Sequence, residues 1–378
     1  MYFNETHDAF RASIKKFVDK QINPHMDEWE EKTVPLHELF KKMGDLGFLG
    51  IRYDPKYGGQ GLDYWFETVM LEEIGHIKGM GVSTAIAVQT NMATPAIAAF
   101  GSEYLKETYL KPAIAGDMVC AIAVTEPNAG SDVFAIKTKA VKKGDYYLLN
   151  GSKTYITNGV QADFLTLLAR TDEAEGYHSF GLFVVPTNLK GFGVSKKLDK
   201  VGLRSSDTAE LFFDDIKVPV ENLIGDDREG FIIQMKQFQH ERFAVLPGTC
   251  SAVQDMIAMT VDYLRQRIVF GKPLITKQVL RHRLADWLTR NEALRQLTYH
   301  IVRMKIEGLD VTREISMGKL LAGQLISEVA GGCLQMHGGI GFMNEMLISR
   351  YFRDSRIMSI GAGADEVMLE IISRIEGF

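Results

Sequence analysis

The spacing of apolar residues changes twice along the chain, and this pattern restricts the possible folds more than any other feature. Up to about residue 119 the spacing is helical, as in the stripe formed by Phe10, Ile14, Phe17, Val18 and Ile22. Between about 120 and 227, short apolar or alternating runs bounded by turn residues indicate strands. The helical spacing returns near residue 228 and persists. This order excludes a doubly wound nucleotide-binding fold, in which strands and helices alternate.

We therefore predict an α+β fold with three domains: an N-terminal α-helical domain (1–119), a middle antiparallel β domain (120–227) and a C-terminal α-helical bundle (228–378). Helices are expected over 36–43, 67–77 and 82–100, and later over 252–267, 278–307 and 312–336. The pairs Asn150-Gly151 and Asn158-Gly159 predict tight hairpin turns, because both residue types tolerate positive φ.

Charge and cysteine content narrow the class of protein. Lys and Arg total 43 against 48 Asp and Glu, a formal net charge of -5. A chain without a basic surplus lacks the electrostatic footprint that nucleic-acid binding needs, so we expect no nucleic-acid partner. Cys120, Cys250 and Cys333 are far apart and lack metal-ligand spacing, so we expect buried free thiols and no metal site. No stretch approaches the ~20 apolar residues of a membrane span, and no secretory signal is recognisable. We expect a cytoplasmic protein.

The segment AVTEPNAGSD (123–132) is dense in backbone hydrogen-bond donors and lies where the helical part meets the first strand. Gly130 and Ser131 can present amides and a hydroxyl to a pyrophosphate or to the edge of a flavin without a charged side chain. An ordinary Asx or Pro turn leading into a strand explains the same composition, and composition alone favours the turn.

A second glycine-rich segment, QMHGGIGFMNE (335–345), is followed by Arg350 and Asp354. It suggests a phosphate-binding loop, but it follows a long helical segment instead of a strand, so it fails the context that a dinucleotide fingerprint requires. A helix C-cap and tight interhelical turn, with His337 as a structural histidine, is the simpler interpretation.

Glu241 lies at an unusual position for a carboxylate. Phe238 precedes it by three residues and Val245 follows it by four, which places Glu241 on the edge of an apolar helical stripe. It either pairs with a basic group such as Arg242 or is desolvated with a raised pKa, which would suit a base acting on a weak carbon acid. Structural ion pairs are the commoner explanation in general.

Taken together, these segments resemble a known family. Segments 123–132 and 335–354 each resemble one of the two sequence signatures of the acyl-CoA dehydrogenase family, and the resemblance extends along the whole chain. YITN (155–158) resembles the family's flavin-contacting strand, and Arg267 with FGKP (270–273) resembles its adenosine-contacting turn. The order of helices, β domain and helices is also that of the family.

Members of this family bind FAD and remove the α-proton and β-hydride of an acyl-CoA thioester, giving the trans-2-enoyl-CoA. The resemblance implies that Val124, Thr125 and Ser131 contact the flavin and its pyrophosphate, with Ser131 also near the CoA arm. Thr157 would hydrogen-bond near flavin N5, and Tyr155 would shield the flavin where many members have tryptophan. The adenosine end of FAD would be held across a subunit boundary, so the resemblance implies a homo-oligomer, and we expect a homotetramer. The residues that would hold this end of FAD are Arg267, Phe270, Gln278, Gln335, Gly338 and Gly339.

The expected catalytic base follows from a difference between this sequence and the motif of the short- and medium-chain branches. In the short- and medium-chain branches the base is a glutamate in a Tyr-Glu-Gly-Thr segment, but the matching residues here are GAGA (361–364). In the isovaleryl and long-chain branches the base is in a Glu-Arg pair on an earlier helix, which Glu241-Arg242 matches. The resemblance thus implies Glu241 as base, the backbone N–H of Ala362 as donor to the thioester carbonyl, and Arg242 near the CoA or substrate.

The electron acceptor implied by the resemblance is an electron-transfer flavoprotein. An oxidase or an enoyl-CoA reductase of the same fold stays open as an alternative, as does an inactive binding or assembly subunit, which the alanine at 362 would permit. The length and branching of the acyl chain stay open as well.

Overall fold

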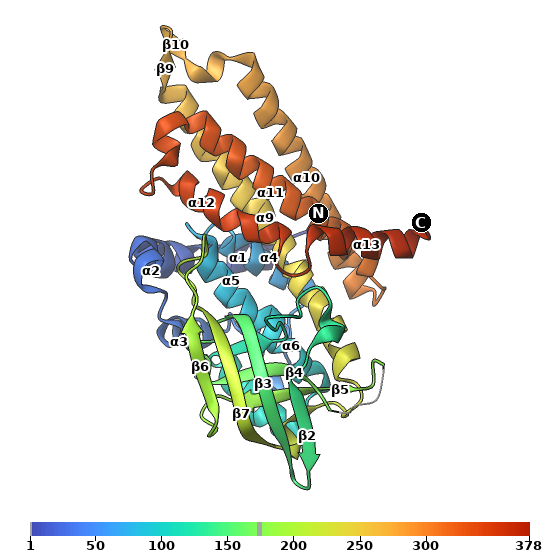
Figure 1. Cartoon of the computed structure of the whole chain (residues 1–378). Helices are drawn as coiled ribbons and strands as arrows, with labels where there is room; N and C mark the ends of the chain where they lie inside the picture. Colours follow the sequence, from blue (N-terminus) through green and yellow to red (C-terminus); the bar gives the residue numbers. More distant parts are fainter. Residues whose placement is uncertain (1, 172–175) are drawn as a thin grey trace.

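The computed structural model describes residues 2–171 and 176–378. Figure 1 shows the N-terminal helices between the sheet and the C-terminal bundle. The first part contains α1 (Glu5–Phe17), α2 (Met26–Lys32), α3 (Leu36–Asp45), α4 (Tyr64–Ile74), α5 (Met80–Ala87), α6 (Pro95–Phe100), α7 (Glu103–Leu105) and α8 (Lys111–Ile114). The last part contains α9 (Gly230–Gln266), β9 (Ile268–Val269), β10 (Lys272–Pro273), α10 (Gln278–Ile306), α11 (Thr312–His337), α12 (Leu347–Ser355) and α13 (Asp365–Glu376). Helical ends with a central sheet confirm the predicted fold class.

The central sheet is mainly antiparallel. Its strands are β1 (Cys120–Ala123), β2 (Lys139–Lys143), β3 (Tyr146–Thr157), β4 (Phe164–Arg170), β5 (Phe180–Pro186), β6 (Phe192–Lys197), β7 (Thr208–Pro219) and β8 (Leu223–Ile224). They follow the order β6-β7-β3-β2-β4-β5-β8, with β1 beside β4. Two pairings, β1 with β4 and β2 with β4, are parallel. The division into three domains stays a prediction.

The hairpin predicted at Asn150-Gly151 is wrong. These residues lie inside the long strand β3, where the register against β7 shifts between Leu149 and Gly151. Asn150 Nδ2 donates to Asp215 Oδ1 across 2.9 Å, and Asp215 N donates back to Asn150 Oδ1. Between the pairs Leu149–Ile216 and Gly151–Phe213, β3 has the single residue Asn150 and β7 has two, Asp214 and Asp215, so the β-bulge lies on β7. Asp215 has a φ of 50°, and Asn150 binds it from the opposite strand.

Asn158-Gly159 does form a turn, with Asn158 at a φ of 66°. The turn leads to β4, which is separated from β3 by β2 in the sheet, so no hairpin results. The residue types thus predicted the turn but not the strand that follows it.

Two helices differ from their predicted extents. The helix expected over 82–100 is divided into α5, a wider π-helical turn at Val88–Ala93, and α6, which begins at Pro95. Proline is favoured at the first turn of a helix, so Pro95 marks this new start. The helix expected from residue 252 begins instead at Gly230 and continues through Pro247. At this point α9 crosses the end of α4, where a Cβ on Gly75 would lie 2.8 Å from Gly248 Cα.

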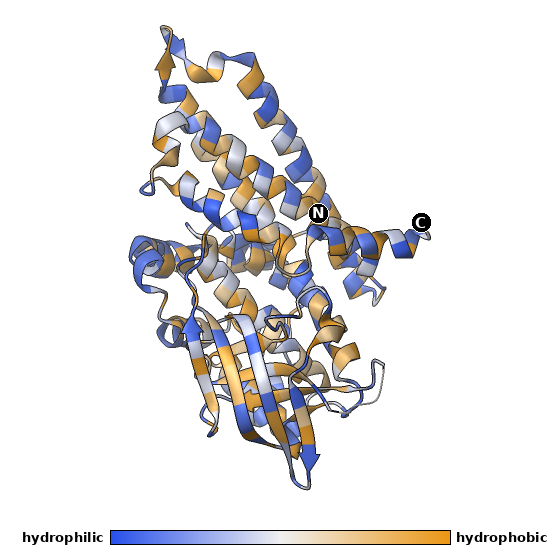
Figure 2. Ribbon diagram, viewed as in Figure 1, coloured by the Kyte–Doolittle hydropathy of each residue, from blue (hydrophilic) through white to orange (hydrophobic). Residues whose placement is uncertain are grey.

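The bundle helices pack around a large apolar core. Figure 2 shows hydrophobic and hydrophilic residues mixed along α9 to α11, as expected for helices that bury one face. Cys120, Cys250 and Cys333 are buried free thiols, as predicted. Within residues 2–171 and 176–378, no helix combines the length and apolar character needed to cross a bilayer.

The end of the second signature connects the three parts of the chain. Asp354 in α12 accepts hydrogen bonds from the amides of Met80 and Leu203, at 2.9 and 2.7 Å. Arg350 forms an ion pair with Asp27 across 2.6 Å and donates to the carbonyl of Lys78. These two residues of the signature therefore join α12 to the N-terminal helices and to the loop before β7.

Candidate active site

Glu241 is a partly buried carboxylate on α9. Among the described residues it forms no hydrogen bond and no ion pair within 4 Å, although Arg242 and Lys319 are near enough to act on it electrostatically. Burial raises the pKa of Glu241 to about 7, and the positive charges of Arg242 and Lys319 oppose this rise. Of the two alternatives that the sequence left open, the ion pair is absent among the described residues, and the raised pKa favours the desolvated carboxylate.

The neighbouring Arg242 connects α9 to the GAGA segment. Its Nε donates to the carbonyl oxygen of Ala362 across 3.2 Å, and its side chain is buried. Ala362 has a φ of 56°, a left-handed conformation, and is partly exposed. Its N–H has no acceptor among the described residues. Arg242 therefore follows a carboxylate without a partner in the sequence and binds the residue whose amide has no acceptor.

The 123–132 loop is fixed more firmly than an ordinary turn. The buried Glu126 accepts hydrogen bonds from the amides of Lys137 and Thr138, at 2.6 and 2.9 Å. Lys153, which is fully buried in β3, donates to Glu126 Oε1 and to the carbonyl of Val124, at 2.9 and 2.7 Å. The sequence prediction missed both Glu126 and Lys153. A lysine within an alternating run of a strand was the only signal that could have drawn attention to the pair.

The same loop lies against the predicted flavin-contacting strand. The amide of Thr154 donates to the carbonyl of Thr125 across 2.9 Å, which brings the Val124 and Thr125 segment beside β3. Tyr155 is 68% exposed at a φ of 60°, and the hydroxyl of Thr157 forms no hydrogen bond with any described residue. The structure thus brings Val124, Thr125, Tyr155 and Thr157 together.

The exposed part of the loop presents donors. Gly130 and Ser131 are exposed, and their amides have no acceptor among the described residues. A Cβ at Gly130 would meet no atom within 4 Å. This end of the loop therefore faces open space with two free N–H groups.

The predicted adenosine-binding residues lie elsewhere. The β9–β10 hairpin stands at the end of the helical bundle that is farthest from the sheet (Figure 1). It carries Phe270, which is 91% exposed at a φ of 51°. Arg267 and Gln278 flank this hairpin and are also exposed. These residues are separated from the 123–132 loop within one chain, so one chain does not bring the two predicted groups together.

The glycine-rich end of α11 lies near this hairpin. Tyr263, close to the end of α9, donates from its hydroxyl to the carbonyl of His337 across 3.0 Å. The ring of His337 stacks on Tyr263, and its Nδ1 lies 2.8 Å from the carbonyl of Cys333. His337 is therefore a structural histidine at the helix end, as the simpler interpretation predicted. Three residues remain exposed beside it, namely Gln335, Gly338 and Gly339.

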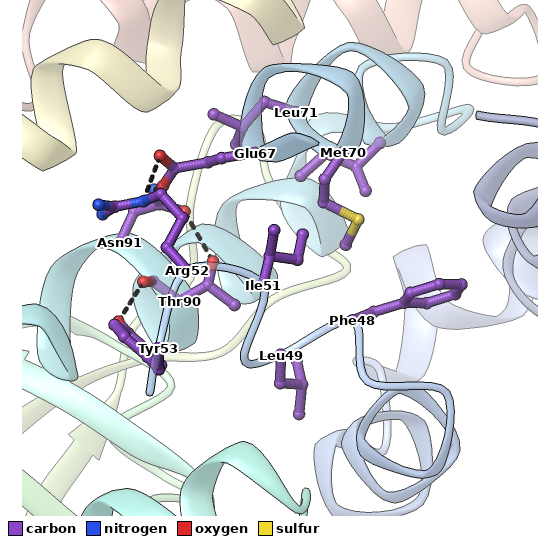
Figure 3. Close-up of a pocket in the computed structure, with 11 residues that line it drawn as sticks. Phe48, Leu49, Ile51, Arg52, Tyr53, Glu67, Met70, Leu71, Thr90 and Asn91 are labelled. Atoms are coloured by element: carbon purple, nitrogen blue, oxygen red, sulfur yellow. Dashed lines mark hydrogen bonds and ion pairs between the residues drawn. The ribbon is translucent and has the colours of Figure 1, made fainter. Parts of the chain in front are cut away.

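A small cavity with a mainly apolar lining lies between the 48–53 segment, α4 and the Val88–Ala93 turn (Figure 3). It has a volume of about 20 Å³, room for about one water molecule. Arg52 and Glu67 form an ion pair across 2.6 Å there, and Asn91 donates to Glu67. Arg52 Nη2 also lies 3.4 Å from His240 Nδ1. Sequence reasoning missed this cluster, because its members come from separate segments.

Burial and two nearby cations explain why His240 is a poor candidate for proton transfer. Burial, together with the charges of Lys305 and Arg52, lowers the pKa of His240 to about 3. The imidazole is therefore neutral near pH 7, and Glu241 is the group in this stretch of α9 with a pKa close to neutrality.

Comparison with known proteins identifies the family of the chain. Three domain models match the chain: acyl-CoA dehydrogenase N-terminal domain over residues 4–117, middle domain over 121–216 and C-terminal domain over 228–376. The chain belongs to the acyl-CoA dehydrogenase family. The expected family is therefore confirmed, and with it an oxidoreductase that acts on acyl-CoA.

Similar members of the acyl-CoA dehydrogenase family cover almost all of the chain. Mitochondrial isovaleryl-CoA dehydrogenase from Pongo abelii is 36% identical over 98% of this chain and 88% of its own length. Mitochondrial long-chain specific acyl-CoA dehydrogenase from Sus scrofa is 36% identical over 98% of this chain and 86% of its own. The crystal structure of acyl-CoA dehydrogenase from Geobacillus kaustophilus is 38% identical, with a TM-score of 0.97 over 100% of this chain and 99% of that one.

Acyl-CoA dehydrogenases use FAD, and the residues present here fit that cofactor. The free amides of Gly130 and Ser131 suit an anionic pyrophosphate, because neutral backbone donors bind phosphate oxygens without a charged side chain. The free hydroxyl of Thr157 and the exposed ring of Tyr155 suit a planar heterocycle. Among the described residues, no group of three or more His, Cys, Asp or Glu could hold a metal ion.

Proposed function

We propose that the enzyme converts an acyl-CoA thioester to the trans-2-enoyl-CoA, with Glu241 as the base that removes the α-proton. The observation that carries this proposal is the Glu241 carboxylate itself, which has no hydrogen-bond or ion-pair partner among the described residues and a pKa of about 7. A general base works best when its pKa is close to the working pH. The proposal agrees with the position of the Glu-Arg pair in the isovaleryl and long-chain branches.

The α-hydrogen of a thioester is a weak acid, so the carbonyl must be polarised as the proton leaves. The free N–H of Ala362 is the proposed donor to that carbonyl. Glu241 takes the α-proton as the electrons of that C–H bond move into the new C=C bond, and the β-hydrogen leaves as hydride. FAD, when bound, would supply the acceptor for this hydride, because amino-acid side chains do not accept hydride.

Other side chains bind and orient the reactants in this proposal. Arg242 positions the segment that carries Ala362 and lies near the substrate. Val124, Thr125, Tyr155 and Thr157 hold the flavin, and Ser131 serves both its pyrophosphate and the CoA arm. The residues at the far end of the bundle complete the FAD site of a neighbouring subunit, which is the basis for proposing a homotetramer: Arg267, Phe270, Gln278, Gln335, Gly338 and Gly339.

The test of the base is the Glu241→Gln variant. Gln keeps the volume and the hydrogen-bonding capacity of the side chain but cannot accept the proton. FAD and acyl-CoA should remain bound, while the rate of flavin reduction by acyl-CoA falls at least ~100-fold, the low end of what a general base supplies. The matched control is Glu292→Gln on α10, which changes an exposed glutamate. Wild-type reduction in Glu241→Gln would refute the base assignment.

The electron acceptor needs a separate experiment. We propose an electron-transfer flavoprotein as the acceptor and a cytoplasmic location for the enzyme, both from the family resemblance. Anaerobic bleaching by acyl-CoA, followed by mixing with air or with an electron-transfer flavoprotein, separates the alternatives. Fast recovery of colour in air alone would instead indicate an oxidase.

A further inference from the structure

The turn at residues 361–363 adopts a conformation that its sequence does not favour. Ala362 has a φ of 56° and Gly363 a φ of 96°, just before α13 begins at Asp365. Glycine tolerates such angles, but alanine avoids them, because its Cβ crowds the following carbonyl. A non-glycine residue keeps this conformation only where the surrounding structure holds it there.

Two cations from different helices hold this turn. Arg242 on α9 donates to the carbonyl of Ala362 across 3.2 Å, and Lys319 on α11 donates from Nζ to the next carbonyl, that of Gly363. The side chain of Lys319 has no exposed surface, and its Nζ lies 3.7 Å from Asp365 Oδ1. Two consecutive carbonyl groups are thus each bound by a buried or nearly buried positive charge.

The held carbonyls restrict the amide of Ala362. Only two rotations, φ and ψ of Ala362, relate this N–H to the carbonyl that Arg242 binds, so fixing the carbonyl limits the directions of the N–H. The amide of Gly361 donates to the carbonyl of Ile357 across 2.8 Å, whereas the amide of Ala362 has no acceptor among the described residues. A free amide on a fixed turn is a preorganised donor.

We infer that Lys319 is a positioning residue for the dehydrogenation: together with Arg242 it holds the 361–363 turn so that the Ala362 amide stays fixed near the Glu241 carboxylate. This inference rests on the proposed function, because it assigns Lys319 a role through the base and the amide proposed there. Lys319 itself touches neither substrate nor flavin in this role.

The charge of Lys319 has a second effect on the same site. Lys319 and Arg242 both favour the ionised form of Glu241 and so limit the rise in its pKa that burial causes. Asp365 faces Lys319 and partly offsets its charge. The other charged or titratable groups packed near this part of α9 are Arg52, Glu67, His240 and Lys305. Removing the charge of Lys319 should therefore raise the pKa of Glu241 further above its ordinary value.

A purely structural role for Lys319 makes different predictions. If Lys319 served only to neutralise Asp365, its loss would lower stability but leave the pH profile of reduction and the motion of the turn unchanged. Replacing both members of the pair would then restore the rate as well as the fold.

The experiment compares Lys319→Met with Lys319→Arg and with the double variant Lys319→Met/Asp365→Asn. The double variant also removes the charge of Asp365, which would otherwise lose its cation. The control is Lys305→Met on α10, which removes another largely buried lysine that lies over the rings of Tyr64 and Phe243. Two quantities are measured: the rate of flavin reduction at saturating acyl-CoA as a function of pH, and amide hydrogen exchange of segment 357–368 without substrate.

In Lys319→Met and in the double variant we expect reduction to slow by about 10- to 100-fold, as for other misplaced donors. The rising limb of the pH profile should shift to higher pH, and segment 357–368 should exchange faster. Lys319→Arg should recover most of the rate, and Lys305→Met should change none of these quantities. If Lys319→Met does not fold, the same measurements on the double variant test the inference.

A folded Lys319→Met enzyme with wild-type rate, pH profile and exchange would overturn the inference, and so would a double variant with a fully restored rate. Failure of the base assignment is distinguishable, because an active Glu241→Gln enzyme contradicts the proposed function while hydrogen exchange still reports whether Lys319 holds the turn.

Discussion

The ammonium of Lys153 lies 2.9 Å from a carboxylate oxygen of Glu126, and neither side chain is more than 8% exposed. This pair joins β3, which carries the proposed flavin contacts Tyr155 and Thr157, to the loop that presents Gly130 and Ser131. This ion pair therefore helps to fix the relative position of two segments that are separated in sequence, together with the hydrogen bond from the Thr154 amide to the Thr125 carbonyl.

We expect Lys153→Met to lower the free energy of unfolding by about 3–5 kcal/mol, because it leaves Glu126 as a buried charge without its cation. The loop should also hold FAD less tightly. Thermal unfolding and the FAD content of the purified protein measure these effects. The double variant Glu126→Gln/Lys153→Met is the control, and it should recover part of the stability. Unchanged stability and FAD content in Lys153→Met would show that the pair does not fix the loop.

The pKa of Glu241 also predicts how stability depends on pH. The folded pKa of about 7 lies above the ordinary value of 4.5, so the folded state binds more protons between these pH values. Stability should therefore decrease as pH rises from about 4.5 to 7 and remain lower above that range. Glu241→Gln removes this cost and should stabilise the protein at pH 8 by up to about 3 kcal/mol, but much less at pH 5. Equal stabilisation at both pH values would contradict the raised pKa.

The same pKa sets a limit on activity. The proposed base must be ionised, so flavin reduction by acyl-CoA should increase with pH through about 7 and then level off. Stopped-flow reduction across pH 5.5 to 8.5 measures this profile. A flat profile over that range would be inconsistent with a glutamate whose pKa is near neutrality.

Thr157→Ala should weaken flavin reduction more than folding. The hydroxyl has no partner among the described residues, so its removal breaks no contact that stabilises the fold. A net hydrogen bond contributes only about 0.5 to 1.5 kcal/mol, but one aimed at flavin N5 acts where charge develops in the transition state. Thermal unfolding should therefore be nearly unchanged, whereas the rate of flavin reduction should fall. Reduction at the wild-type rate would remove Thr157 from the site.

Retention of FAD should depend on assembly. Phe270 stands almost fully exposed at the far end of the bundle, which suits a residue that completes a neighbour's site. Phe270→Ala should lower FAD content while leaving the fold of each chain intact. Sedimentation combined with FAD absorbance provides the measurement. A monomer that holds one FAD per chain would contradict both the shared site and the proposed tetramer.

The sequence predicted the fold well where local patterns decide structure. Periodicity located α10 and α11 almost to their ends, because long helices with an apolar face repeat their signal many times. It failed at Asn150, where residue types typical of a hairpin turn instead continue β3 opposite a bulge in β7, a partner strand that comes much later in the chain. Tertiary pairing decided between two structures that the local sequence permits equally.

The proposed site was predictable in part for a similar reason. Glu241 and Ala362 could be singled out by spacing and by family resemblance, because each belongs to a recognisable segment. Lys319 could not, because it lies within a helix whose local sequence gives no sign of the turn it reaches. A buried lysine acquires its role from a carbonyl group supplied by a distant segment, and such a pairing leaves no local pattern.

Helix α9 carries Glu241 near its beginning and leads directly to Arg267 at its end. The 26 residue steps from Glu241 to Arg267 span about 39 Å along the helix axis. If the far end of each chain completes a neighbour's site, every chain contributes a base to one site and an adenosine-binding end to another. Mixed oligomers of Glu241→Gln and Phe270→Ala chains would then contain some sites assembled wholly from unaltered parts. Two impaired variants would thus complement each other, and the effect of a harmful substitution in one copy would depend on which end of this helix carries it.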